Sequence, residues 1–164
     1  MSDIVIRYAL IEELDKIVML VQEVCKDADI WTGYPPEDMK EEFSYCFFEY
    51  EEDDYHYNFM TPKCLVAEYK NEIIGMITFR QSYMSGSVFD LGWCMIKPKF
   101  QHSLLGAGVR LANHVINYIK SIRNNGIIQV AAIDPKLLSK LGFIDSGLTV
   151  NEWGVELKIL HMKF

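Results

Sequence analysis

The segment 89–120 constrains the fold most, because three different local patterns follow one another there in a fixed order. Residues 89–96 are apolar and aromatic and stop shortly before Pro98, which is typical of a strand. The end of the segment spaces its apolar residues as one face of a helix does. A turn with Gly106 and Gly108 lies between the two. Glycines let the backbone approach a ligand, and the first N–H groups of a helix are free to donate, so this order predicts an anion-binding turn.

The rest of the chain alternates between strand and helix patterns, without a linker or an internal repeat. Short apolar runs bounded by turns predict strands, and apolar residues three or four positions apart predict helices. In the last run Val155, Leu157 and Ile159 alternate with Glu156 and Lys158, the pattern of a half-buried strand. The expected strands are 4–8, 64–69, 73–80, 88–96, 127–133, 143–150 and 155–162, and the expected helices are 10–24, one after residue 37, 109–120 and 136–141.

Three strings in this order resemble the Gcn5-related N-acetyltransferase (GNAT) family. Ile96-Lys97-Pro98 is similar to a strand end of that family, Gly106-Ala107-Gly108 to its glycine loop, and Leu141-Gly142-Phe143 to the end of its short helix. The resemblance implies an α/β fold, with a mixed central sheet of about seven strands flanked by about four helices. It covers the chain as a single domain over residues 1–164.

The resemblance further implies that acetyl-CoA is the co-substrate, held without a metal. In the family, loop amides bind the pyrophosphate, and a strand that often carries a bulge pairs with the pantetheine arm and supplies an N–H to the thioester oxygen. The residues implied in this role are Cys94, Met95, Ile96, Ser103, Leu104, Leu105, Gly106, Ala107 and Gly108.

Two positions depart from the family pattern. The loop position that is usually Arg or Gln falls on Ser103. The run from Pro98 to Gly106 is about two residues longer than the family pattern, and Gln101 takes the role of that Arg or Gln only if the loop bulges. Many members carry a tyrosine acid four residues before the glycine that is Gly142 here, and that position is Leu138. A leucine cannot donate a proton to a leaving thiolate, although water can.

The activity implied is acetyl transfer from acetyl-CoA to an amine by direct attack. A base must take a proton from the ammonium, and the candidates are Asp90 and Glu68, because carboxylates near the central strands serve this role in relatives. Exposed carboxylates at strand ends explain both residues equally well. The alternative function is a non-catalytic acetyltransferase-like binding module, which Ser103 and Leu138 favour and the two glycines of the loop disfavour.

Composition narrows the partners. The net charge of -7 argues against nucleic acid as the main partner, since phosphate binding needs Lys and Arg. The scattered cysteines and histidines argue against a zinc site or a disulfide framework, and they favour a cytoplasmic protein. The apolar runs are too short for a membrane span. A homodimer stays an open expectation.

The segment 41–54 is strongly acidic and carries interleaved tyrosines. In the family this region borders the acceptor site, so an acidic, aromatic rim here suits an amine-bearing small molecule or a basic protein. A solvated charge run beside a packed helix is the alternative interpretation.

Overall fold

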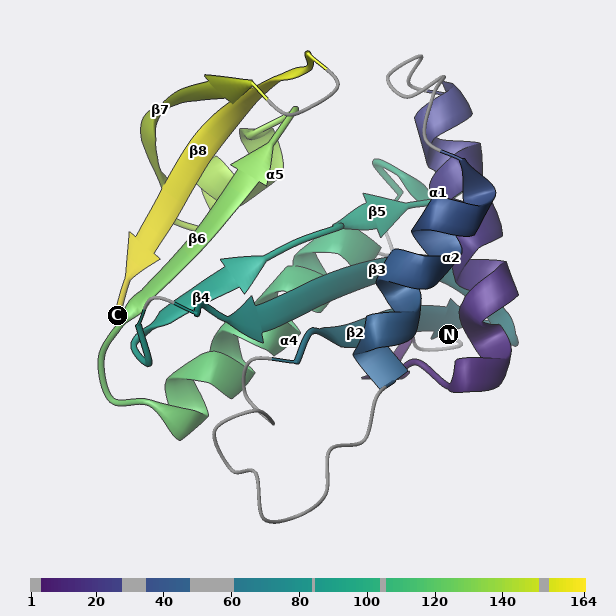
Figure 1. Ribbon diagram of the computed structural model, residues 1–164, viewed down its shortest axis with the longest axis horizontal. Coiled ribbons are helices and arrows are strands. Elements are labelled where there is room, and N and C mark those ends of the chain that lie inside the picture. Colours follow the sequence, from purple (N-terminus) through teal and green to yellow (C-terminus); the bar gives the residue numbers. More distant parts are fainter. Residues whose placement is uncertain (1–3, 28–34, 48–60, 84, 104–105, 151–153) are drawn as a thin grey trace.

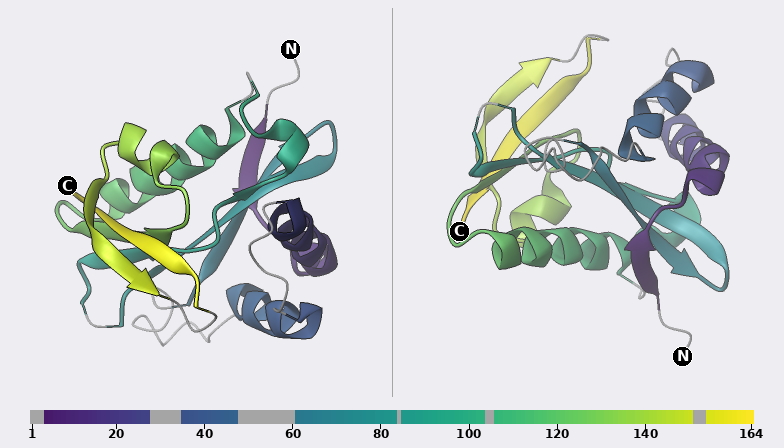
Figure 2. Two further views of the ribbon diagram at one scale, coloured as in Figure 1. Left: turned by 90° about the horizontal axis from the view of Figure 1, so that it is seen from above. Right: turned by 60° about the horizontal axis from the view of Figure 1, so that its bottom comes forward.

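The computed structural model describes residues 4–27, 35–47, 61–83, 85–103, 106–150 and 154–164. An eight-stranded sheet has the order β1-β2-β3-β4-β6-β8-β7, and β5 pairs with β3 outside this path. Helices α1 and α2 cover one face of the sheet and α4 and α5 the other (Figure 2). The strands are β1 Val5–Tyr8, β2 Lys63–Tyr69, β3 Glu72–Gln81, β4 Val88–Leu91, β5 Met95–Ile96, β6 Ile127–Ala132, β7 Ile144–Val150 and β8 Glu156–Lys163, and the α-helices are α1 Leu14–Asp27, α2 Pro36–Ser44, α4 Ala107–Ile122 and α5 Lys136–Lys140.

This arrangement confirms the expected α/β fold and the expected order of its described elements. The sheet has eight strands rather than about seven, because the strand expected over residues 88–96 is divided into β4 and β5. All neighbouring strands are antiparallel except β4 and β6, which run parallel.

Two apolar cores lie on opposite faces of the sheet. Leu111, Val115 and Ile119 of α4 pack in the larger core, and Ile17 and Val21 of α1 pack in the smaller one. β2 and β3 contribute to both cores, so these strands are apolar almost without interruption. β6 faces a core on one side only, and its burial therefore alternates along the strand.

A β-bulge separates β4 from β5. On β3, Phe79 pairs with Leu91 and Met76 with Met95, so three residues of one strand oppose two residues of the other. One extra residue opposite β3 is the definition of a bulge. Gly92 opens the bulge by donating its N–H to the Thr78 carbonyl at 2.8 Å. β4 still pairs with β6, but β5 pairs with β3 alone, and Figure 1 shows β6 turning away from β5.

One local expectation is corrected by the packing. The face of β8 that is buried carries Leu160 and Met162, while Leu157 and Ile159 lie on the half-buried opposite face. The larger core lies beneath the first pair, and a strand pattern that is apolar on both faces does not show which face will be covered. At α5 the N-cap is Pro135, and the Asp134 carboxylate accepts from the Lys136 N–H at 3.0 Å.

Candidate active site

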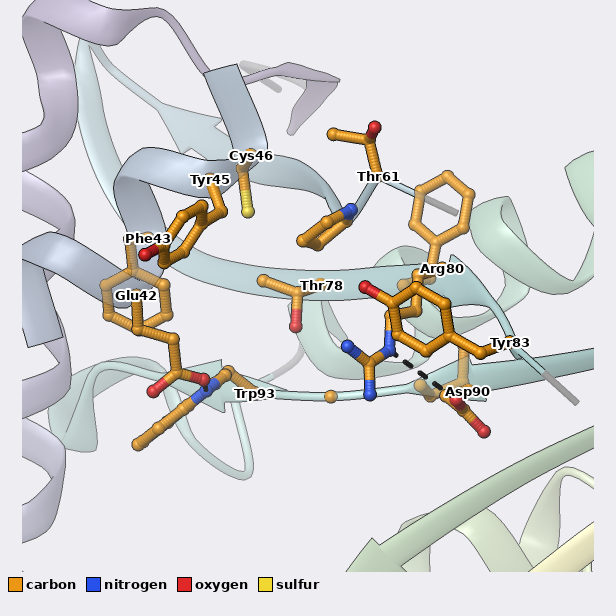
Figure 3. Close-up of a pocket in the computed structure, with 14 residues that line it drawn as sticks. Glu42, Phe43, Tyr45, Cys46, Thr61, Thr78, Arg80, Tyr83, Asp90 and Trp93 are labelled. Carbon is orange, nitrogen blue, oxygen red and sulfur yellow. Dashed lines mark hydrogen bonds and ion pairs between the residues drawn. The ribbon is translucent and has the colours of Figure 1, made fainter. Parts of the chain in front are cut away.

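A pocket of about 500 Å³ lies between α2 and the strands β3 and β4. Figure 3 shows the side chains that surround it, with Glu42 and Tyr45 on one side and Arg80, Tyr83 and Asp90 on the other. Gly92 and Trp93 of the bulge form part of its wall. The pocket therefore touches the backbone at the point where the sheet opens.

Glu42 is held at the bulge by a hydrogen bond. The indole Nε1 of Trp93 donates to the Glu42 carboxylate at 2.7 Å, and the Trp93 ring packs edge-on against Phe43 with the ring centroids 5.3 Å apart. Phe43, the next residue of α2, is buried in the smaller core, and this packing holds the Glu42 carboxylate at the pocket. Glu42 is thus the carboxylate tied to the bulge itself.

Asp90 also lines the pocket, as part of a polar cluster. Its carboxylate accepts from the Gln129 amide at 2.7 Å and lies 3.5 Å from Nε of Arg80. Arg80 is its cross-strand partner on β3, and the guanidinium carbon lies 5.1 Å from the centre of the Tyr83 ring. Asp90, the first of the two predicted bases, is therefore in the pocket but already carries two polar partners.

Glu68, the second predicted base, lies elsewhere. It accepts from Nη2 of Arg7 at 2.6 Å, and the same Arg7 binds Glu13 at 2.7 Å. Glu68 pairs with Ile73 on β3, five residues before Thr78 at the bulge, which is roughly 15 Å along a strand. The structure does not bring Glu68 and Asp90 together, and the ion-pair cluster around Arg7 explains Glu68 as a structural residue.

The start of α4 has the geometry of an anion site. Gly106 is the N-cap in the left-handed region, with φ of 60°, and no side chain caps the helix. A Cβ on Gly108 would lie 3.2 Å from Leu137 and 3.5 Å from Ile96, so the first turn of α4 passes close to both β5 and α5. The N–H groups of Ala107 and Gly108 precede the helical bonding pattern and are free to donate. Leu104 and Leu105 lie outside the described residues.

The loop before α4 accommodates its extra length in a 3₁₀ turn over Pro98–Phe100. The Ser103 hydroxyl donates to the Phe100 carbonyl at 2.8 Å, and the Gln101 amide donates to the Ile96 carbonyl at 2.8 Å. Both side chains therefore bind their own loop. Neither points a free donor at the first turn of α4, as the Arg or Gln of the family pattern was expected to do.

β5 presents an open backbone edge. The Lys97 N–H donates to Ile74 of β3, so the N–H and C=O of Ile96 point the opposite way, toward the side where β6 departs. The Ile96 carbonyl accepts from the Gln101 side chain, so the N–H of Ile96 is the group left at this edge. Met95 pairs with Met76, and Cys94 packs against the larger core. Of the predicted set, Cys94 is the last residue of the bulge, and Met95 and Ile96 lie between the bulge and the start of α4.

The cysteines are neutral at physiological pH. Burial raises the pKa of the Cys94 thiol to about 11, and burial followed by the charge of Glu42 raises that of Cys46 to about 12. Burial also raises the pKa of Cys25 and Cys64. A thiol attacks as its thiolate, so none of these cysteines is set up as a nucleophile.

Leu138, at the position of the family's tyrosine acid, points into the core and not toward the start of α4. Leu138 is 5% exposed and belongs to the larger core, whereas its neighbour Leu137 is half-buried and lies toward Gly108 and Ile96. Hydrogen bonds at both ends of α5 accompany this packing: the Asp134 carboxylate accepts from the Lys136 N–H, and the Phe143 N–H donates to the Leu138 carbonyl at 3.1 Å. Sequence counting gave the position but not the direction of the side chain.

The acetyltransferase (GNAT) family matches residues 29–143, which is more than half of the chain. The chain belongs to the GNAT acetyltransferase family. This confirms the resemblance carried by the glycine loop and the Leu-Gly-Phe string, and it supports an N-acetyltransferase. No curated protein shows significant similarity to the chain.

Solved structures of GNAT acetyltransferases have the same fold. A GNAT acetyltransferase from Streptococcus pneumoniae is 16% identical with a TM-score of 0.68, over 99% of each chain. The PaiA N-acetyltransferase from Thermoplasma acidophilum, in complex with coenzyme A, is 17% identical with a TM-score of 0.69, also over 99% of each chain. A chimera of the spermidine N-acetyltransferase SpeG from Vibrio cholerae and hSSAT is 19% identical with a TM-score of 0.64, over 97% of this chain and 95% of that one.

The remaining predictions concern the surroundings of the site. Of the acidic segment 41–54, residues 41–47 are described, and Glu42 and Tyr45 from this part line the pocket. Residues 48–54 lie outside the described residues. Across the described ranges, no three His, Cys, Asp or Glu side chains are grouped to hold a metal ion, and no helix is long and apolar enough to cross a membrane.

Proposed function

We propose that this GNAT acetyltransferase transfers the acetyl group of acetyl-CoA to an amine bound in the pocket between α2 and the bulge. One observation supports this most directly. The bulge at Gly92 and Trp93 joins the pocket on one side to β5 and the start of α4 on the other. An acceptor and a CoA thioester could therefore meet at this piece of backbone from opposite directions.

The cofactor side would use backbone groups. The N–H groups of Ala107 and Gly108 at the start of α4 suit the pyrophosphate, because a helix N-terminus attracts anions. The N–H of Ile96 on the edge of β5 suits a carbonyl of the pantetheine arm, since an extended chain can add to a strand edge. A second bond, to the Ile96 carbonyl, would have to displace the Gln101 amide. A backbone N–H of the bulge would then stabilise the thioester oxygen as negative charge develops.

The acceptor side would use Glu42 as the base. Its carboxylate takes a proton from the ammonium, and the neutral amine attacks the thioester carbonyl carbon. The carbon–sulfur bond then breaks, and the departing thiolate takes a proton from water, because Leu138 cannot supply one. The products are the N-acetylated amine, free CoA and one proton. We favour Glu42 over Asp90, because Asp90 is held by Gln129 and Arg80 whereas Trp93 ties Glu42 to the bulge.

An amine acceptor is also consistent with the relatives. The structural neighbour from Vibrio cholerae is a spermidine N-acetyltransferase chimera, and spermidine carries amines only. The aromatic rings of Tyr45 and Trp93 and the charge of Glu42 would attract an ammonium group.

The test compares Glu42→Gln with Asp90→Asn. Glutamine keeps an oxygen that can accept from Trp93 but cannot take a proton. With mass spectrometric detection of the acetylated amine, we expect Glu42→Gln to lower kcat by about 10²–10⁴-fold. The affinity for acetyl-CoA, measured by calorimetry, should not change. If Glu42→Gln keeps the kcat of wild type and Asp90→Asn loses most of it, Asp90 is the base instead of Glu42.

The alternative, a non-catalytic binding module, is favoured by one observation: no tyrosine occupies the family's acid position, which is the buried Leu138. Under this alternative the protein binds CoA or acetyl-CoA, and its melting temperature rises on titration with either. Yet no amine in a broad panel is acetylated. Turnover of any amine above the uncatalysed rate would exclude the module.

A further inference from the structure

Arg80 is unexpected in a pocket for a cationic amine. Its guanidinium would repel an ammonium group, and its ion pair with Asp90 is made at Nε, 3.5 Å from the carboxylate. In the part of the chain that the structure describes, neither terminal nitrogen of Arg80 has a hydrogen-bond acceptor. Figure 3 shows these two nitrogens directed away from Asp90 and toward the middle of the pocket. The terminal nitrogens of Arg80 are therefore placed to bind an anionic group of a ligand.

The guanidinium is held in one orientation before any ligand binds. Asp90 lies at its Nε edge and is itself fixed by Gln129 at 2.7 Å. Tyr83 covers a face of the guanidinium, with its ring centre 5.1 Å away. The two terminal nitrogens form the edge that remains, and the side chain is 42% exposed, so a ligand in the pocket can reach them. A planar fork with two parallel N–H groups matches a carboxylate in bidentate geometry.

We propose that the acceptor carries a carboxylate as well as its amine, and that the terminal nitrogens of Arg80 bind this carboxylate. The proposal rests on the proposed function, because it places the amine at Glu42 on the other side of the same pocket. Asp90 beside Arg80 and Trp93 beside Glu42 are three residues apart, which is at most about 10 Å along the chain. The amine and the carboxylate are therefore at opposite ends of a short acceptor.

Two kinds of molecule have this chemistry. One is an α-amino acid with an amine on its side chain, and the other is a short peptide with free termini. A diamine without a carboxylate would fit the pocket less well, since it would leave Arg80 facing a second cation. Glu42 and Asp90 outnumber Arg80 in the pocket, so the amine end is still attracted.

The experiment uses pairs of acceptors that differ in the carboxylate alone. Lysine is compared with cadaverine, and glycylglycine with glycylglycinamide, in wild type, Arg80→Gln and Arg80→Lys. We expect wild type to prefer the carboxylate member of at least one pair, and the preferred pair identifies the kind of acceptor. Arg80→Gln should lower kcat/KM for that member by roughly 10- to 100-fold, the range for a lost charged hydrogen bond, and should not lower kcat/KM for the member without a carboxylate. Arg80→Lys keeps the charge without the fork and should lie in between.

Lys120→Gln is the matched control. Lys120 is an exposed residue of α4, on the opposite face of the sheet from the pocket, and its replacement removes one positive charge without changing the preference. The melting temperature of each variant separates a specific loss from unfolding. A wild type that prefers the members without a carboxylate, or an Arg80→Gln variant that loses both members of a pair equally, would overturn the proposal.

The two proposals fail in different ways. If amines are acetylated without regard to the carboxylate, the acetyltransferase proposal stands and the role of Arg80 is wrong. If no amine is acetylated, ligand-observed NMR measures binding of lysine and glycylglycine directly. Binding that Arg80→Gln removes and Lys120→Gln retains would support the carboxylate site on its own, and absence of binding to wild type would reject it.

Discussion

Gly92→Ala is the substitution that tests the bulge most sharply. A Cβ on Gly92 would overlap with the Thr78 hydroxyl oxygen on β3, and the next nearest contact is the Thr78 Cβ at 3.7 Å. Gly92 does not have a positive φ, so an alanine there is strained by this contact alone and not by its own backbone. The alanine must push β3 and the start of the bulge apart or turn the buried Thr78 side chain away.

The expected cost follows from overpacking. One extra methyl in a close-packed site typically costs about 1–3 kcal/mol. For a chain of this size, 1 kcal/mol shifts the melting temperature by about 2–4 °C, so Gly92→Ala should lower it by about 2–12 °C. Thr78→Ala removes the obstacle. In the double variant most of the Gly92→Ala penalty should disappear, which gives a coupling free energy of about 1–2 kcal/mol between the two positions.

The assay is urea denaturation of wild type, both single variants and the double variant, with acetyl-CoA turnover measured alongside. The bulge forms the wall of the pocket, so Gly92→Ala should reduce turnover and the double variant should recover part of it. Additive losses in stability would refute the reasoning, because they would mean that the two side chains do not meet. A Gly92→Ala variant as stable as wild type would show that the bulge has a different register.

Three further predictions concern other parts of the site and fold. Gly108→Glu should abolish binding of acetyl-CoA in calorimetry, because its negative charge would lie at the expected phosphate site; Gly108→Gln, which has the same bulk, should weaken binding much less. Equal affinities of wild type and Gly108→Glu would exclude the start of α4 as a phosphate site. Leu138→Tyr should lower the free energy of unfolding by about 1–3 kcal/mol without raising kcat, because this leucine is in the core; a gain in kcat would show that the side chain reaches the thioester. Glu13→Gln should destabilise the protein by about 1.5–3 kcal/mol at pH 7, because Glu13 is 11% exposed and binds Arg7. The hydrogen bond from Arg7 lowers the pKa of Glu13 below 4.5, so this stabilisation is fully present above that pH and is lost as pH falls through the lowered pKa. The free energies of unfolding of wild type and Glu13→Gln should therefore converge in acid. A constant difference between them down to pH 2 would contradict the role of Arg7.

Local patterns in the sequence determined the elements. The continuous apolar runs of β2 and β3 and the helical spacing of α4 depend on neighbours along the chain, and both were predicted correctly. Of the two glycines expected in the turn before the helix, Gly106 is the left-handed N-cap, whereas Gly108 lies in the first turn of α4. Such features need only residues a few positions apart, so one sequence is enough to find them.

The site required the tertiary structure. The bulge becomes visible only when β4 and β5 are both registered against β3. Glu42 and Trp93 are 51 residues apart, and nothing near either residue indicates the hydrogen bond between them. Glu68 sits on a strand much as Asp90 does, yet Arg7, 61 residues away, makes it structural.

The direction of the Leu138 side chain also could not be predicted from the sequence, although it depends on a short segment. The sequence placed it on a short helix, but the packing of α5 on the larger core decided that Leu138 turns inward and Leu137 outward. A five-residue helix has little periodicity of its own, so its rotation is determined by the surface that it covers. Element type follows from local spacing, whereas register, rotation and the partners of each charge follow from contacts between distant segments.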